Sequence, residues 1–80
     1  MLSGMTQTTS RIADKVRGVA AEKRFTQGAI AQALGIARSS VAERLAGRVS
    51  FTADEILKLS AAMDVPVSRF FPEPSLERVA

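Results

Sequence analysis

The sequence predicts an all-α protein, a single small domain of four to five short helices. Apolar residues recur every three or four positions along most of the chain, which is the spacing of amphipathic helices. Residues that favour helix starts and helix ends stand between these stretches. No strand pattern appears, and 46% of the 80 residues are hydrophobic, which argues against disorder. Only 5% are aromatic, so we expect an aliphatic, alanine-rich core between closely packed helices.

The first helix is expected to follow a short N-terminal segment. Residues 1–8 are small and polar without a period, so they are predicted to be flexible. Thr9 or Ser10 can then cap the helix, which should end within residues 22–24. Its apolar stripe, with i, i+4, i+7 and i+8 spacing, consists of Ile12, Val16, Val19 and Ala20.

Two short helices, over residues 27–34 and 38–46, are predicted to follow with a tight turn between them. Thr26 can cap the first of them, because its hydroxyl can accept a hydrogen bond from a backbone N–H of the first turn. Gly35 stands at the turn, where a positive φ is needed, and Gly47 closes the second helix. The apolar residues of this pair are Ile30, Ala31, Leu34, Val41 and Leu45.

A fourth helix is predicted to open at Thr52. Thr52 and Glu55 have the spacing of a capping box, in which each side chain bonds the backbone N–H of the other residue. Adjacent carboxylates at Asp54 and Glu55 might suggest acid–base chemistry, but capping explains them better, because no pocket, metal ligand or nucleophile accompanies them.

The remainder of the chain is predicted to hold one more short helix and a tail. Pro66 blocks continuation of the fourth helix, and residues 67–71 then form a short fifth helix with Ser68 as its cap. Two prolines open the segment 72–80, which is expected to be a short tail or linker. The predicted domain therefore covers residues 9–71.

Positive charge is concentrated in the middle of the chain. The whole chain carries a net charge of +3, but residues 23–48 hold five basic residues and one acidic residue, a net charge of +4. Residues 49–80 carry a net charge of −2. A polyanion is the natural partner of such a segment, and an ordinary solvated helix surface is the alternative.

The residue types that are missing exclude several functions. The chain has no cysteine and no histidine, which removes thiolate nucleophiles, histidine bases and the usual zinc sites. We therefore expect no enzymatic activity, no cofactor, no metal site and no small-molecule ligand. No apolar run approaches the roughly 20 residues of a membrane span, and the first ten residues lack the features of a signal peptide. A cytoplasmic protein without membrane contact is expected.

The segment 26–47 resembles the helix-turn-helix of the phage repressor and Cro family. The matching positions are Thr26, Gln27, Ile30, Ala31, Leu34, Gly35, Ile36, Val41, Leu45 and Gly47. The similarity extends over roughly residues 12–71, and it implies a lambda-repressor-like bundle whose second motif helix lies in the major groove of double-stranded DNA. A pair of helices that only packs is the alternative, but such a pair needs no basic, small-residue outer face.

The outer face of the second motif helix supplies the predicted base contacts. Arg38 begins this helix, and a bidentate contact of Arg with guanine O6 and N7 is the commonest specific contact in the major groove. A phosphate contact or a stack on Gln27 is the alternative for Arg38. Glu43 either accepts from a cytosine amino group or only orients Arg38 or Arg44, and the orienting role is favoured. The predicted base contacts are Arg38, Ser39, Ala42 and Glu43.

Residues beside the reading face are predicted to contact the DNA backbone. In the resembled family, the residue at the position of Gln27 grips a phosphate and braces the start of the next helix. The family often has glutamine where this chain has Arg38, so the bracing pair of glutamines is not carried over. The predicted backbone contacts are Gln27, Ser40, Arg44, Arg48, Lys23 and Arg24. Roughly four to six phosphate contacts would give a slope of about −4 to −5 for log K against log salt concentration.

Together these features predict a transcriptional repressor of the phage-immunity type that acts by occluding its operator. The alternative is an antitoxin-like helix-turn-helix protein that binds a toxin and autoregulates its operon, although the short tail counts against it. We expect a mainly monomeric chain, with at most a weak homodimer. Either the apolar residues after Pro66 form that interface or they complete the monomer core: Phe70, Phe71, Leu76 and Val79.

Overall fold

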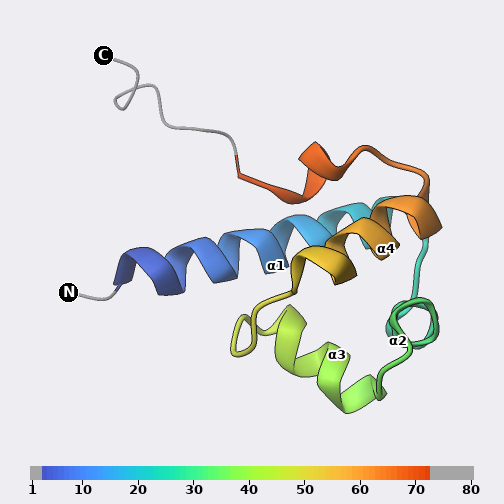
Figure 1. Cartoon of the computed structure of the whole chain (residues 1–80), viewed down its shortest axis with the longest axis horizontal. Coiled ribbons are helices and arrows are strands. Elements are labelled where there is room, and N and C mark those ends of the chain that lie inside the picture. The colour runs from blue at the N-terminus through green and yellow to red at the C-terminus, as the bar shows by residue number, and fades with distance from the viewer. Residues whose placement is uncertain (1–2, 73–80) are drawn as a thin grey trace.

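Four α-helices and one 3-10 helix make up the described part of the chain (Figure 1). The computed structural model describes the backbone of residues 3–72 and the side chains of residues 11–72. The elements are α1 (Ser3–Lys23), α2 (Gln27–Leu34), α3 (Arg38–Leu45), α4 (Ala53–Met63) and the 3-10 helix η1 (Val67–Phe70). No strand occurs within residues 3–72, so the predicted all-α fold is confirmed.

Helix α1 is longer than predicted. It begins at Ser3 rather than after Thr9 or Ser10. Residues 5–10 contain no glycine or proline, and a helix that is already nucleated gains one hydrogen bond for each residue that it adds. The predicted apolar stripe does face the core, because Val16, Val19 and Ala20 are buried and Ile12 packs against them.

Helix α2 has the predicted bounds, and α3 begins at Arg38 as predicted but ends at Leu45, one residue earlier than predicted. The hydroxyl of Thr26 accepts a hydrogen bond from the N–H of Ala29 at 3.1 Å, which caps α2. Gly35 ends α2 with a φ of 69°, and Gly47 follows α3 with a φ of 82°. Such values strain any residue with a Cβ, so a glycine at each position lets the chain reverse without that cost.

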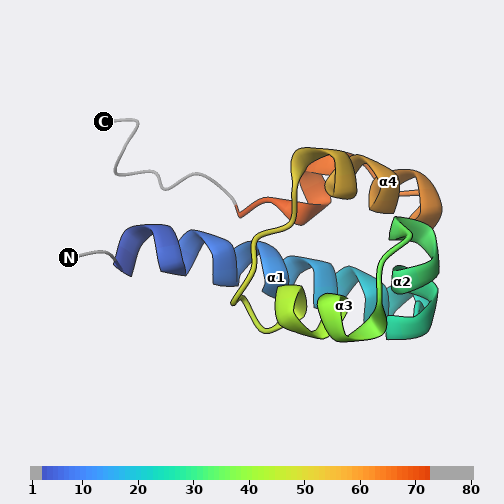
Figure 2. The same cartoon turned by 60° about the horizontal axis from the view of Figure 1, so that its bottom comes forward.

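The core lies where α1, α4 and the α2–α3 pair meet. Helix α2 packs on α3 and α4, while α1 packs on α3 and η1. Five large side chains from all five elements are fully buried there: Val16, Ile30, Val41, Leu59 and Phe70. Figure 1 places α3 and η1 on opposite sides of the molecule, with α1 and α4 between them, and Figure 2 shows α4 and η1 together on the side away from α3.

The two adjacent phenylalanines of the C-terminal segment have different surroundings. Phe70 is fully buried against α1 and α4, so it completes the monomer core and is not available to an interface. Phe71 is 43% exposed. Ser68 does not cap the segment as predicted, because η1 starts at Val67 directly after Pro66. The other two residues of the predicted interface, Leu76 and Val79, lie outside the described residues.

Candidate nucleic-acid interface

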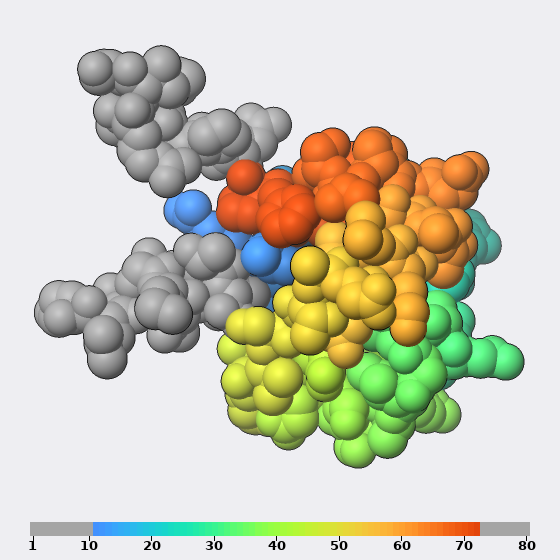
Figure 3. Space-filling model, viewed as in Figure 1, coloured from blue at the N-terminus to red at the C-terminus, as the bar shows by residue number. Residues whose placement is uncertain are grey.

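The outer face of α3 is exposed and built mainly from small residues. Val41 and Leu45 point into the core and are buried, which fixes the opposite face of this eight-residue helix outward. The exposed residues of that face are Arg38, Ser39, Ala42, Glu43 and Ala46. In Figure 3 the segment from α2 to α3 forms one continuous part of the surface, coloured in greens. Small side chains leave the backbone of α3 accessible to a partner.

Arg38 lies at the start of α3 and folds back toward the start of α2. A Cβ atom added to Gly28 would meet Cζ of Arg38 at 3.7 Å, so the guanidinium lies against this glycine. Arg38 is exposed and has no ion-pair partner within residues 11–72. The neighbouring Gln27 is also exposed, and it lines a shallow hollow of about 240 Å³ between α1, α2 and α3. The guanidinium of Arg38 and the side chain of Gln27 are therefore both exposed near the start of α2.

Glu43 is paired with Arg48 and not with the residues that the sequence analysis names. Nη1 of Arg48 donates to Oε2 of Glu43 at 3.3 Å. Glu43 thus contacts Arg48 in place of Arg38 or Arg44, because the turn after α3 brings Arg48 back over Glu43. That turn is closed by a hydrogen bond from the N–H of Arg48 to the carbonyl of Glu43 at 3.0 Å. Both side chains remain largely exposed, so the pair can open to a partner.

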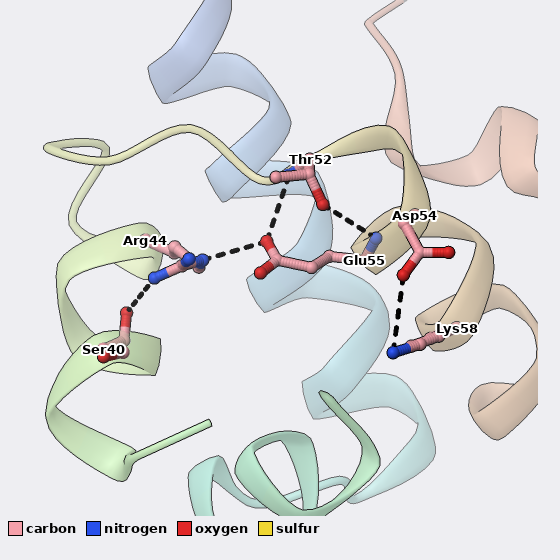
Figure 4. A network of polar contacts seen from close by, with 6 residues as sticks. All are labelled: Ser40, Arg44, Thr52, Asp54, Glu55 and Lys58. Carbon is pink, nitrogen blue, oxygen red and sulfur yellow. Dashed lines mark hydrogen bonds and ion pairs between the residues drawn. The ribbon is translucent and has the colours of Figure 1, made fainter. Parts of the chain in front are cut away.

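Arg44 faces α4 and does not project beside the outer face of α3 (Figure 4). Its Nε donates to Oε1 of Glu55 at 2.9 Å, and its Nη1 donates to the carbonyl of Ser40 at 3.2 Å. Its side chain is 17% exposed, and that of Glu55 is 12% exposed. The predicted phosphate contact of Arg44 is therefore not favoured by the free structure, because Nε and Nη1 of Arg44 both donate to groups within the fold. Ser40, another predicted backbone contact, is half-buried beneath Arg44.

Glu55 joins this ion pair to the start of α4. The predicted capping box is present: Oε1 of Glu55 accepts from the N–H of Thr52 at 3.0 Å, and the Thr52 hydroxyl accepts from the N–H of Glu55 at 3.0 Å. Burial raises the pKa of Glu55, but the hydrogen bonds from Arg44 and Thr52 together with the charge of Arg44 outweigh it, so the pKa lies below its ordinary value. The ionised Glu55 therefore binds Arg44 of α3 and also caps the start of α4.

The basic residues of the segment 23–48 fall into two groups. Arg44 and Arg48 are paired with carboxylates. Lys23, Arg24 and Arg38 are exposed and have no carboxylate partner within residues 11–72. These three residues lie at the end of α1 and at the start of α3, which flank α2. The uncompensated positive charge is thus smaller than the sequence count suggests.

Arg17 is a residue that the sequence analysis did not single out. It donates through Nη1 to the carbonyl of Leu45 at the end of α3, and it also pairs with Asp14. It lines the same hollow as Gln27. No sequence signal identifies this contact, because it joins residues 28 positions apart through the packing of α1 on α3.

Within residues 3–72, no group of three or more His, Cys, Asp or Glu residues is placed to hold a metal ion. Over the same range, no helix combines the length and the apolar character that crossing a bilayer requires.

Comparison with known proteins identifies a family that this chain matches. Residues 12–72 match a family whose description is "Protein of unknown function (DUF739)". No curated protein and no solved structure matches the chain. The matched range begins inside α1 and ends just after η1, so it includes the whole core and the whole α2–α3 segment.

Proposed function

The chain belongs to the DUF739 family, and we propose that it is a sequence-specific double-stranded-DNA-binding protein that represses transcription by occupying an operator. In this proposal α2 and α3 are a helix-turn-helix, and α3 enters the major groove. The resemblance of residues 26–47 to phage repressors and Cro proteins supports the phage-immunity type of regulator.

The observation that carries the proposal is the outer face of α3. Its residues are exposed and mostly small, and its first residue, Arg38, has no ion-pair partner within residues 11–72. A helix of this kind can approach base edges closely, because alanine methyl groups and serine hydroxyls occupy little of the groove. Arg38 has the reach and the two parallel donors that a guanine O6 and N7 pair requires.

The other predicted site residues are assigned either to base edges or to phosphates. Ser39 and Ala42 lie on the exposed face and are assigned to base edges, while Glu43 can accept from a cytosine amino group once Arg48 turns to a phosphate. Four exposed side chains around this face are assigned to phosphates: Gln27, Lys23, Arg24 and Arg48. Arg44 and Ser40 are left out of the contact set, because they are engaged within the fold.

The experiment selects bound duplexes from a random DNA library and then measures affinity for the enriched site and for random DNA. Arg38→Ala should weaken binding to the enriched site by about 1–3 kcal/mol and relax discrimination at one base pair. Its effect on random DNA should be small, because base contacts carry the discrimination.

Arg11→Ala is the matched control. Arg11 is an exposed arginine of α1 that lines a hollow with Pro72, just after η1, so its loss should leave operator discrimination unchanged. Failure of the library to enrich any duplex would refute the proposed function. An equal loss on enriched and random DNA in Arg38→Ala would instead assign Arg38 to a phosphate.

A further inference from the structure

The Arg44–Glu55 pair differs from the other ion pairs in how deeply it lies. Among the ion pairs of residues 11–72, its two side chains are 17% and 12% exposed, whereas those of the other pairs are between 41% and 75% exposed. Exposed pairs contribute little to a fold, while a pair shielded from water interacts more strongly. This pair also joins two helices, since Arg44 belongs to α3 and Glu55 to α4.

The geometry holds Arg44 from two sides, as Figure 4 shows. One side of the guanidinium bonds the carbonyl of Ser40, one turn back on α3, and the other bonds the carboxylate of Glu55. That carboxylate oxygen is itself held by the backbone N–H of Thr52, just before α4. A planar guanidinium with donors in a fixed fork suits such a double contact, and a lysine ammonium does not.

Helix α3 needs a device of this kind. It has only eight residues, and its N-cap residue Ala37 makes no side-chain capping bond. A helix this short has little stability by itself, so its orientation depends on tertiary contacts. Val41 and Leu45 are buried where α3 packs on α2 and α1, and Arg17 of α1 bonds the carbonyl of Leu45 at the end of α3. The Arg44–Glu55 contact adds a directional polar bond to a third helix, α4, and so restricts rotation of α3 about its axis.

We propose that Arg44 is a positioning residue, which couples the orientation of α3 to the capping box of α4 through Glu55 and thereby holds the outer face of α3 in the pose that DNA binding requires. This inference rests on the proposed function. It assigns to Arg44 a role in recognition without contact with DNA.

The decisive variant is Glu55→Gln, because positioning and simple electrostatics predict opposite signs for it. Glutamine retains the acceptor for Thr52 and still suits a capping box, but it removes the charge that holds Arg44. Loss of a negative charge should strengthen DNA binding if only the overall field matters. Loss of the coupling should weaken operator binding by roughly 2- to 30-fold, the range for mutations that act on a ligand site without touching the ligand.

Asp54→Asn is the matched control. It removes the same charge one position earlier, from an exposed pair with Lys58 that lies entirely on α4. Operator binding should stay equal or become tighter in this variant. If Glu55→Gln also binds equally or more tightly, with its fold intact by circular dichroism, the positioning role is overturned.

Arg44 variants separate positioning from phosphate contact. Arg44→Met should weaken operator binding without changing the slope of log K against log salt, and Arg44→Lys should restore little of the loss. A phosphate contact would instead lower the magnitude of the slope by about 0.9 in Arg44→Met and would be largely rescued by lysine. That pair of results would overturn the inference while leaving the proposed function in place.

Amide hydrogen exchange tests the coupling without DNA. In Glu55→Gln and Arg44→Met, the backbone amides of α3 should exchange faster relative to those of α1, and in Asp54→Asn they should not. Unchanged exchange in α3 would overturn the inference even if the protein binds DNA. Faster exchange in a chain that binds no DNA would support the coupling and refute the proposed function instead.

Discussion

Two residues hold a backbone conformation that their side chains disfavour. Arg24 and Asp64 have φ values of 59° and 58°, in the left-handed region. Each follows a helix and lets the next N–H return to a carbonyl of the last turn: Phe25 bonds Ala20 at 2.7 Å, and Val65 bonds Ser60 at 3.1 Å. Glycine normally occupies such a position, because a Cβ is strained there. A side chain at these sites therefore reduces the stability of the fold.

We predict that Asp64→Gly and Arg24→Gly each raise the free energy of unfolding by about 0.5–1 kcal/mol, as measured by urea denaturation. Glycine removes the strain of the left-handed conformation, but part of this gain is lost because glycine also gives the unfolded chain more conformational entropy. The two variants should differ in function. Arg24→Gly should weaken binding to all DNA duplexes, because it removes an exposed cation beside α2 that has no ion-pair partner within residues 11–72, whereas Asp64→Gly should not. Destabilisation in both variants would contradict the strain argument.

At the scale of elements, the start of α4 supports more than its own helix. The capping box satisfies backbone N–H groups that have no partner within the helix, and its carboxylate also receives Arg44 from α3. The pKa of Glu55 lies below its ordinary value of 4.5, since burial raises it less than Arg44 and Thr52 lower it. A carboxyl group with a lowered pKa stabilises the fold above the pKa of the unfolded chain.

We predict that the wild type is more stable than Glu55→Gln between pH 5 and 7 and that this difference shrinks as the pH falls below about 4.5. The ionised carboxylate provides the difference, and it is lost as the pH falls through the lowered pKa of the folded state. Urea denaturation across this pH range measures it. Glu22, whose pKa is lowered by Arg69, is present in both proteins and cancels. A difference that does not change with pH would show that the charge of Glu55 contributes nothing.

At the scale of the whole molecule, internal ion pairs reduce the charge that can act on a partner. Five basic residues lie in the segment 23–48, but Arg44 is turned inward and Arg48 is shared with Glu43. Lys23, Arg24 and Arg38 remain unpaired within residues 11–72. With Arg38 assigned to a base, three basic side chains are left for phosphates: Lys23, Arg24 and Arg48.

We therefore predict a slope of about −3 for log K against log salt, smaller in magnitude than the −4 to −5 expected from the sequence. Titrations of random duplex DNA at several salt concentrations measure it. Removing one of the three side chains, as in Lys23→Met, should lower the magnitude by about 0.9, whereas Lys58→Met on α4 should not. A slope near zero would exclude an electrostatic mechanism.

The exposed apolar surface bears on assembly. Phe70 is used by the core, and the large apolar residues that remain exposed within residues 11–72 are Val49, Leu57 and Phe71. We predict that the chain is mainly monomeric at micromolar concentration. The area that these three side chains could bury is smaller than the area that a standard stable interface buries. Sedimentation over a concentration series tests this prediction, and a dimer that persists at nanomolar concentration would contradict it.

Local physical chemistry determined most of the secondary structure. The caps at Thr26 and Thr52 and the glycines at 35 and 47 act within one helical turn, so their residue types alone placed the ends of α2 and α3 and the start of α4. The apolar spacing likewise identified the buried faces of these helices. The early start of α1 was not predicted, because residues 3–8 lack a helical signal although nothing in 5–10 blocks a helix.

Tertiary structure alone decided which distant partners Arg17 and Arg44 take. The sequence shows that Arg44 lies near the reading face of α3, but only the packing of α3 near the start of α4 turns it toward Glu55. The same holds for Arg17 on Leu45 and for the burial of Phe70 rather than Phe71. A long side chain can reach partners in several directions, and its choice depends on where helices distant in sequence come to lie. Composition and periodicity carry no information on that arrangement.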